Sequence, residues 1–380
     1  MTAALVVGGG PAGAEVARRI ALAGEDVVLL ERDASTVDKV CGEFLSREAV
    51  LYLKAAGIDL ASFGAVPIDT VRLATREIVA EVALPFEASS LSRRILDEAS
   101  LALAAAQGVR IERGCPVRAF MRTPGGHRAV LADGRTFDAR ALFIATGKHD
   151  LRGHKRAPGL QNDLVGFKLH YVLTGENTRA IERCVELILF DGGYAGLQPI
   201  ERGRANLCLL VRKDQLARCG GRFDSLIESI SIASPHLGRR LRGASRCWEK
   251  PLAIASIPYG YVRAPADEVF WVGDQSAVIP SFSGDGISIA LHSARLAADT
   301  YLAGGTPAAF QRALARDVKG QVLFATALSQ AMVNDRPQRA LALIAHHFPS
   351  LVRSIASHTR VADVALRRAG LAPTALRATR

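Results

Sequence analysis

The hydrophobic positions near the N-terminus predict a strand, a helix and a second strand in close succession. Residues 3–7 are a continuous apolar run, which is typical of a parallel strand buried on both faces. Residues 14–23 have the periodicity of a helix that Gly24 ends, and residues 27–30 form another apolar run. The pattern therefore indicates a β-α-β unit at the start of the chain.

Alternating apolar and polar positions further along predict a second, mostly antiparallel sheet. Residues 70–86 alternate as a hairpin of half-buried strands, and polar turns separate three further strands at 185–190, 194–200 and 205–211. From about residue 306 the pattern is helical. The uncharged run 320–334 is too short and too polar for a bilayer span, so it predicts a packed helix.

Composition places the chain among globular proteins with a basic surface. Hydrophobic residues make up 49% and charged residues 22% of the chain, which excludes global disorder. Lysine and arginine total 48 against 37 acidic residues, and this formal charge of +11 favours an anionic membrane, a carrier or a phosphate-bearing cofactor. Aromatic residues are only 6%, and no nucleic-acid-reading motif occurs, so we expect no nucleic-acid partner.

The cysteines and the N-terminus lead to expectations about metal and location. The six cysteines form no CxxC pair and have no metal-ligand spacing with the histidines, so we expect reduced thiols and no metal site. The first strand is not preceded by a basic start, a long apolar region or a cleavage site. We therefore expect a cytoplasmic protein.

A glycine motif joins the first strand to the first helix. Gly8, Gly10 and Gly13 fit G-x-G-x-x-G, and the second strand leads to Glu31, 18 residues after the last glycine. In this motif the first glycine permits the tight turn, the second lets a pyrophosphate approach the backbone, and the third lets helix and strand pack closely. The helix amides face the phosphates and the acid takes the ribose hydroxyls, so the segment predicts a dinucleotide site.

A second glycine-rich segment lies far downstream. A buried strand at 269–272 leads into Gly273 and Asp274, and Gly284 and Gly286 precede a helix expected at 287–302. The N-terminal GGGPAG and this GDQSAVIPSFSGDGIS together resemble the FAD-binding architecture of para-hydroxybenzoate hydroxylase-type monooxygenases, flavin-dependent halogenases and geranylgeranyl reductase-like proteins. The resemblance implies that Asp274 holds the ribityl chain and that the second glycine turn, with Ile287, lies beside the isoalloxazine ring. The alternative is an ordinary glycine turn.

Three intermediate segments carry the same resemblance. Residues 39–46 match the K-x-C-G segment with which geranylgeranyl reductase-like proteins contact the flavin, residues 93–97 match R-x-x-L-D, and residues 145–147 match A-T-G. Cys41 either modulates the flavin or is only a small buried residue, and Arg93 either lies near the cofactor or begins a solvated helix. The cofactor positions implied are Gly8, Gly10, Pro11, Ala12, Gly13, Glu31, Arg32, Cys41, Gly42, Arg93, Val117, Ala145, Gly147, Gly273, Asp274, Gly284, Gly286 and Ile287.

The chain also departs from each of these families. The D-G motif that monooxygenases associate with NAD(P)H use is replaced by residues 147–153, which puts NADPH as direct reductant in doubt. The electron donor is then either NAD(P)H or a partner reductase. The aromatic-Trp-x-Phe-Pro strand of geranylgeranyl reductases and the W-x-W-x-I-P motif of halogenases are missing as well.

Taken together, the motifs predict an α/β fold with a three-layer, Rossmann-like FAD-binding domain. That domain is expected to be discontinuous, at 1–70, 90–165 and 262–305, with an antiparallel substrate domain at 71–89 and 166–261 and a helical region at 306–380. In the resembling families such a sheet binds substrate, which makes Tyr194, Gln198, Asn206 and Tyr259 candidate pocket residues. Arg353, Arg360 and Arg367 recur every seven residues, so we expect them along one helix face, either solvated or docked on a membrane or acyl carrier.

The expected function is FAD-dependent redox chemistry on a hydrophobic small molecule. We favour flavin monooxygenation of an aromatic or polyketide-like substrate. One alternative is reduction of lipid carbon–carbon double bonds by reduced FAD, and another is a flavin-binding protein without its own turnover. Because the flavin carries the chemistry, no side chain is obligatory as nucleophile, and His149, His170 and His292 are only conceivable bases.

Overall fold

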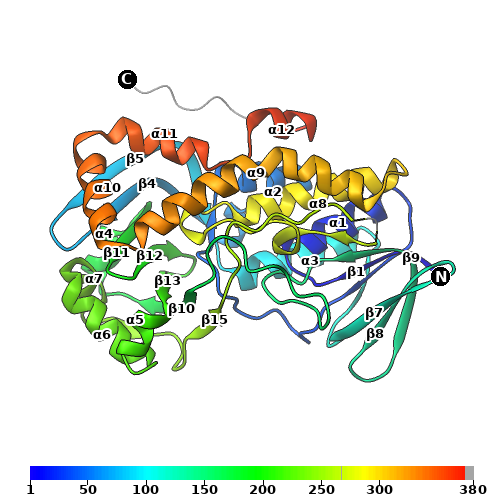
Figure 1. Cartoon of the computed structure of the whole chain (residues 1–380), viewed down its shortest axis with the longest axis horizontal. Coiled ribbons are helices and arrows are strands. Elements are labelled where there is room, and N and C mark those ends of the chain that lie inside the picture. The colour runs from blue at the N-terminus through cyan, green and yellow to red at the C-terminus, as the bar shows by residue number, and fades with distance from the viewer. Residues whose placement is uncertain (267, 373–380) are drawn as a thin grey trace.

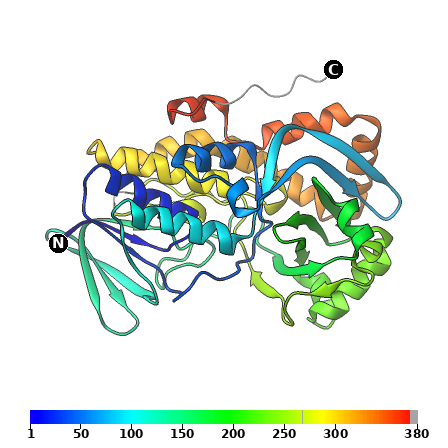
Figure 2. The same ribbon diagram turned by 180° about the vertical axis from the view of Figure 1, so that it is seen from behind.

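Two β-sheets lie side by side, and a long C-terminal helix crosses both (Figures 1 and 2). The computed structural model describes residues 1–266 and 268–372. The first sheet holds the N-terminal strands. The second sheet and its covering helices form the other half of the molecule.

The first sheet has seven strands in the order β6-β2-β1-β9-β8-β7, with β16 beside β9. β6, β2, β1, β9 and β16 run parallel, and β7 and β8 continue the sheet as an antiparallel hairpin. The strands are β1 (Thr2–Val7), β2 (Val27–Leu30), β6 (Arg110–Glu112), β7 (Val117–Thr123), β8 (Gly126–Leu131), β9 (Thr136–Ile144) and β16 (Phe270–Trp271).

Both faces of the parallel strands are buried, which explains their continuous apolar sequence. Ala4 and Val6 belong to the same core as the helices α1 (Pro11–Leu22), α3 (Arg93–Ala106) and α8 (Gly286–Leu302). Leu5 and Val7 point to the opposite core, as expected from the period of two along a strand. The predicted β-α-β unit is present, and the helix begins at Pro11 because proline is well tolerated in the first turn.

The second sheet has nine strands in the order β14-β10-β13-β12-β11-β4-β5-β3, with β15 beside β10. All neighbours pair antiparallel except β11 and β4. The strands are β3 (Phe44–Leu45), β4 (Val66–Ala74), β5 (Val79–Ser90), β10 (Leu164–Val172), β11 (Cys184–Phe190), β12 (Gly193–Ile200), β13 (Arg204–Arg212), β14 (Ser245–Arg246) and β15 (Leu252–Ala255). The domain boundaries predicted after residues 70 and 165 fall inside β4 and β10.

Short helices and turns complete both halves. α6 (Phe223–Ala233) and α7 (Pro235–Leu241) pack on the second sheet, and α2 (Arg47–Ala56) packs against α8. The remaining short elements are α4 (Gly175–Ala180), α5 (Lys213–Arg218) and the 3-10 turns η1 (Ala61–Phe63), η2 (Gly273–Gln275) and η3 (Ser281–Ser283).

The C-terminal region is helical, as predicted. α9 (Pro307–Met332) runs along the molecule, and α10 (Asp335–His347) and α11 (Pro349–His358) lie over β4 and β5 before α12 (Asp363–Arg368) (Figure 1). Within the described ranges, no helix is both long and apolar enough to cross a membrane.

The prediction that Arg353, Arg360 and Arg367 share one helix face is wrong. α11 ends at His358, so Arg353 lies in α11, Arg360 lies between helices and Arg367 lies in α12. Arg360 turns inward, where its guanidinium lies 4.7 Å from the centroid of the Phe86 ring. The seven-residue spacing predicts a continuous helix at Arg360, whereas in the structure this residue lies outside the helices and makes a tertiary contact.

Candidate functional site

Two adjoining cavities, together called the cofactor cavity, lie at the carboxyl ends of β1, β2 and β9. Their volumes are about 380 and 120 Å³. This is the edge at which α/β sheets bind ligands. Every predicted cofactor position except Gly13 lines one or both of them, namely Gly8, Gly10, Pro11, Ala12, Glu31, Arg32, Cys41, Gly42, Arg93, Val117, Ala145, Gly147, Gly273, Asp274, Gly284, Gly286 and Ile287.

Gly13 lies behind the cavity, where α1 touches the end of β1. A Cβ atom at this position would lie 1.8 Å from the carbonyl oxygen of Gly8, so only glycine allows the helix to approach so closely. The N-cap of α1 is Gly10, and no side chain caps the helix. The first amides of α1 are therefore left for a ligand in the cavity.

Glu31 supports the same turn from the end of β2. Its carboxylate accepts hydrogen bonds from the backbone amides of Gly9, at 2.6 Å, and of Asp33, at 3.0 Å. The side chain is buried and also lines the cofactor cavity. It therefore fixes the glycine turn in addition to facing the position expected for a ribose.

The second glycine segment closes the cavity from the opposite side. Asp274 lines both parts of the cavity, and the side chain of Asp285, the N-cap of α8, makes no capping bond, so the first amides of α8 are uncapped. A Cβ atom added at Gly42, Gly147 or Gly286 would meet no protein atom within 4 Å, because these glycines face open space. A smooth cradle with two helix N-termini fits a flat, phosphate-bearing cofactor such as FAD.

Arg93 begins α3 and is held at the cavity wall by an acid. Its guanidinium donates to Asp97 at 2.8 and 3.0 Å, and Asp97 also accepts from Lys39 at 2.9 Å. Burial alone would lower the pKa of Arg93, but the Asp97 carboxylate outweighs it and raises that pKa. Arg93 therefore presents a fixed positive charge to the cavity.

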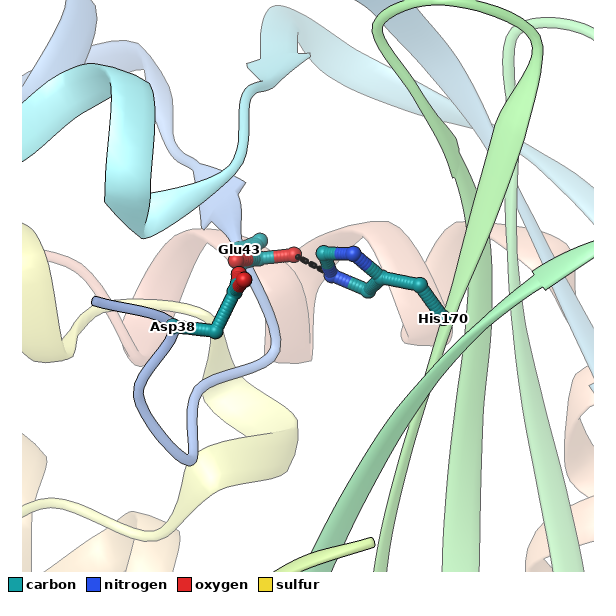
Figure 3. A group of neighbouring side chains, drawn as sticks. All are labelled: Asp38, Glu43 and His170. Carbon is teal, nitrogen blue, oxygen red and sulfur yellow. Dashed lines mark hydrogen bonds and ion pairs between the residues drawn. The ribbon is translucent and has the colours of Figure 1, made fainter. Parts of the chain in front are cut away.

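A cluster of charged groups, here called the Glu43 cluster, lies beside the cavity and comprises the partly exposed Asp38 and the buried Glu43, Lys168 and His170. Figure 3 shows Glu43 on the loop before β3 and His170 on the facing strand. The Glu43 carboxylate accepts from Lys168 Nζ at 2.5 Å and lies 2.7 Å from His170 Nε2, while Lys168 also contacts Asp38 at 3.3 Å. Burial opposes ionisation of Glu43, but the hydrogen bond from His170 and the charge of Lys168 hold the pKa of this carboxyl below its usual value.

The cluster fixes the backbone that faces the cavity. Glu43 has φ of 61°, an uncommon conformation for a residue with a side chain. Its carboxylate also accepts the amide of Arg93 at 2.8 Å, and Asn206 donates to the carbonyls of Cys41 and Gly42 at 3.1 and 2.8 Å. The peptide between Cys41 and Gly42 is thus held in one position at the cavity wall.

Asp38, Glu43 and His170 lie close enough together to ligate a metal ion. The Lys168 ammonium already contacts both carboxylates, so a cation would have to displace it. Glu43 and Lys168 are not among the residues predicted from the sequence to have a role in the site. Lys168 and His170 are two residues apart in an otherwise apolar strand, so they share one face of it. This spacing was the sequence signal that could have indicated a polar site there.

A second cavity, here called the apolar cavity, adjoins the cofactor cavity. It has a volume of about 190 Å³ and shares Gly42, Phe44, Ser281 and Gly284 with the cofactor cavity. Most of its wall is aliphatic and comes from β4, β5, β11 and the helices α9, α10 and α11. Tyr194 and Gln198 of the predicted pocket residues line it, whereas Tyr259 lines the cofactor cavity and Asn206 anchors the loop.

Two further groups, one behind the cavities and one in the wall of the cofactor cavity, have shifted pKa values. Asp285 is fully buried against Ser46, at 3.0 Å, and Arg360, at 3.6 Å, and burial raises its pKa to about 7. His149 lines the cofactor cavity, where burial and the nearby Arg32 lower its pKa. The third conceivable base, His292, is buried between Tyr52 and Asp317 at 2.7 and 3.0 Å and lines neither cavity.

Comparison with known proteins identifies similar chains. Residues 1–146 match the FAD binding domain family. The menaquinone reductase of Mycolicibacterium smegmatis is 27% identical over 322 residues, covering 79% of this chain and 76% of that protein. The digeranylgeranylglycerophospholipid reductase 2 of Methanopyrus kandleri is 26% identical over 317 residues, covering 78% and 75% of the two chains.

A solved structure shows the same fold over nearly the whole length. The myxobacterial chondrochloren halogenase CndH superposes with a TM-score of 0.76 and 18% identity, covering 97% of this chain and 95% of that one. The domain match, the relatives and this fold agree with the cavity geometry. The chain is therefore an FAD-dependent oxidoreductase.

Proposed function

We propose that this enzyme reduces a carbon–carbon double bond in a lipid that carries an isoprenoid chain. The observation that carries this proposal is the aliphatic wall of the apolar cavity beside the part of the cofactor cavity lined by Gly284, where the family resemblance implies the flavin ring. The two relatives named above are reductases of lipids, menaquinone and digeranylgeranylglycerophospholipid, and isoprenoid chains are common to both molecules. This proposal replaces the monooxygenation that the sequence favoured.

The size of the apolar cavity suits one segment of such a chain. An apolar cavity of ~150 Å³ is large enough to hold benzene. The volume of about 190 Å³ here is therefore enough for a ring or for a short stretch of hydrocarbon. Burial of the double bond among Leu73, Leu187 and Ile344 would exclude water from it.

The reaction adds a hydride to one carbon of the double bond and a proton to the other. When bound in the cofactor cavity, reduced FAD would supply the hydride with its electron pair and so be oxidised. Tyr259 and Ser281 hold a proton where the two cavities meet, because Tyr259 Oη lies 2.7 Å from Ser281 Oγ and Ser281 lines both cavities. Burial raises the pKa of Tyr259 well above its usual value, so this hydroxyl stays protonated.

Hydroxylation of an aromatic or polyketide-like substrate is the second candidate. Gln198 is compatible with it, because its buried amide nitrogen lines the apolar cavity without a hydrogen-bond partner in the described part of the chain. A phenol or ring carbonyl oxygen could accept that hydrogen bond. A quinone carbonyl could accept it equally, so Gln198 is compatible with both candidates.

A single-turnover experiment separates the two reactions. The FAD-loaded protein is reduced with dithionite under anaerobic conditions and mixed with a short-chain menaquinone or a geranylgeranyl lipid, and products are analysed by mass spectrometry. We expect a product whose isoprenoid chain gains two hydrogen atoms and no oxygen, measured after the quenched sample has been reoxidised so that any quinol has returned to the quinone. A product that forms only after oxygen is added, and that gains one oxygen atom, would replace the proposal with hydroxylation.

A matched pair of variants on α10 tests whether the apolar cavity holds the substrate. Ala345 is buried and lines the cavity, whereas Ala340 is exposed on the same helix. Ala345→Phe should fill the cavity and slow product formation at least about tenfold, and Ala340→Phe should leave it unchanged. Both variants should keep the flavin spectrum. Equal activity of the two variants would place the substrate elsewhere.

A further inference from the structure

The helices α10 and α11 are apolar on two opposite sides. Their inner side lines the apolar cavity with Leu341, Ile344, Val352 and Ile355, among others. Their outer side exposes three large apolar side chains around the turn between the helices. Leu343, Phe348 and Leu351 are 48%, 61% and 46% exposed. Outward apolar side chains so close together indicate a surface that meets an apolar medium.

The same region is strongly basic. Residues 335–372 contain six arginines and two aspartates, with no lysine or glutamate. Asp363 pairs with Arg47, which removes one of the two negative charges from the surface. Arg360 and Arg368 pair with Asp285 and Asp317, whereas Arg339, on α10, is exposed and forms no ion pair with the described side chains. The exposed charge around the turn is therefore positive, which complements an anionic surface.

The apolar cavity is too small for a whole isoprenoid lipid. Its volume of about 190 Å³ accommodates only a short segment, so the rest of a long chain must remain outside. If the enzyme bound the lipid in water, the part of the chain outside the cavity would be exposed to water, at a cost of ~0.8 kcal/mol for each CH₂ group taken out of an apolar environment. An apolar medium at the mouth of the cavity removes this cost.

We propose that the outer side of α10 and α11 docks on an anionic lipid bilayer, from which the substrate chain enters the apolar cavity between these helices and the second sheet. Leu343, Phe348 and Leu351 would insert at the level of the headgroups, while Arg339 and neighbouring arginines contact lipid phosphates. The lipid substrate rests on the proposed function, but the docking surface does not.

A bilayer explains the surface better than an acyl carrier protein does. An acidic carrier would satisfy the arginines, but it would not need three large apolar side chains in the open around one turn. An interfacial helix, in contrast, combines basic residues with exposed leucine and phenylalanine. The mixed chemistry of this surface therefore favours the lipid.

Vesicle flotation tests the docking surface without any turnover. The FAD-loaded full-length protein is mixed with vesicles of phosphatidylcholine alone or of equal parts phosphatidylcholine and phosphatidylglycerol. We expect binding to the anionic vesicles that weakens as salt rises, and at least about tenfold weaker binding for the Leu343→Glu/Phe348→Glu double variant. Ile232→Glu is the matched control, because Ile232 is 75% exposed on α6, across the second sheet from α11 (Figure 1). It should bind like the unchanged protein.

Three outcomes would overturn the proposal: no binding to anionic vesicles, equal binding by the double variant, or binding only to an acidic acyl carrier protein. Activity assays keep this test separate from the proposed function. A short, water-soluble isoprenoid should be reduced equally by the unchanged protein and the double variant, whereas a lipid presented in vesicles should be reduced more slowly by the variant. Loss of the proposed function alone would leave vesicle binding intact but give no reduced product in either format.

Discussion

At the scale of single residues, Glu43 joins parts of the molecule that are far apart in sequence. Its carboxylate contacts His170, which lies 127 positions further along the chain, and it also accepts a hydrogen bond from the backbone amide of Arg93, where α3 begins. The side chain is fully buried and stays ionised beside Lys168. A buried ion pair contributes little net stability, so we interpret its value as positional: it holds the Cys41–Gly42 peptide at the cofactor cavity.

Removal of the Glu43 charge alone should nevertheless destabilise the protein, because it leaves the buried Lys168 charge without its main partner. Among the described side chains, Glu43→Gln leaves the Lys168 ammonium with Asp38 as its one anionic partner, at 3.3 Å. Loss of one partner of a buried pair costs ~3–5 kcal/mol, and we expect the lower end because Asp38 remains. Urea unfolding at neutral pH measures the loss. Adding Lys168→Met should restore part of it, and a double variant no more stable than Glu43→Gln would contradict this account.

The same pair predicts the response to acid. Because the pKa of Glu43 is lower in the folded protein, its contribution is present above the unfolded value of about 4.3 and is lost as pH falls through the folded value. Between pH 5 and about pH 3, the unchanged protein should lose stability more steeply than the Glu43→Gln/Lys168→Met variant. Urea unfolding over this pH range makes the comparison.

At the scale of elements, the contact of α1 with β1 decides whether the cofactor cavity forms. A side chain at Gly13 would enter the space of the Gly8 carbonyl. Gly13→Val should push α1 away from the sheet, lower the free energy of unfolding by ~3 kcal/mol or more and abolish FAD retention. Leu22→Val, exposed at the end of the same helix, should retain FAD. Flavin absorbance of the purified variants measures retention, and a Gly13→Val protein saturated with FAD would refute the packing role.

Elements with local signals could be predicted from the sequence, and contacts between distant elements could not. The glycine turn and the strand that ends before Glu31 are written in consecutive residues, as are the alternating strands β11, β12 and β13. The Glu43 cluster depends on the docking of a loop onto β10, which no local pattern specifies. After α11 ends at His358, Arg360 packs against Phe86, and the seven-residue spacing of arginines gave no sign of this break or of this contact.

At the scale of the whole molecule, the open question of the electron donor concerns the segment that follows β9. In the monooxygenases that this chain resembles, the corresponding D-G motif helps to shape the approach of the nicotinamide. Here two of the basic side chains, Lys148 and Arg156, are engaged by the protein. Lys148 donates to the carbonyl of Val40 at 3.0 Å, and Arg156 binds Asp150 at 2.6 Å and the carbonyl of Asp274. These hydrogen bonds hold the segment to Val40 and Asp274, which both line the cofactor cavity.

This arrangement predicts slow direct reduction by NAD(P)H. Fast hydride transfer requires the nicotinamide to stack against the flavin in a near-attack geometry, and the tied segment does not provide the approach that the D-G motif shapes. Stopped-flow mixing of the oxidised, FAD-loaded protein with NADPH, NADH or dithionite tests this, with dithionite as the control that the flavin is reducible. We expect rapid reduction by dithionite only.

Because the chain carries a formal charge of +11, an acidic reductase should restore fast reduction, at a rate that falls as salt rises. Rapid reduction by NADPH alone would mean that the segment opens for the nicotinamide and that no partner protein is needed.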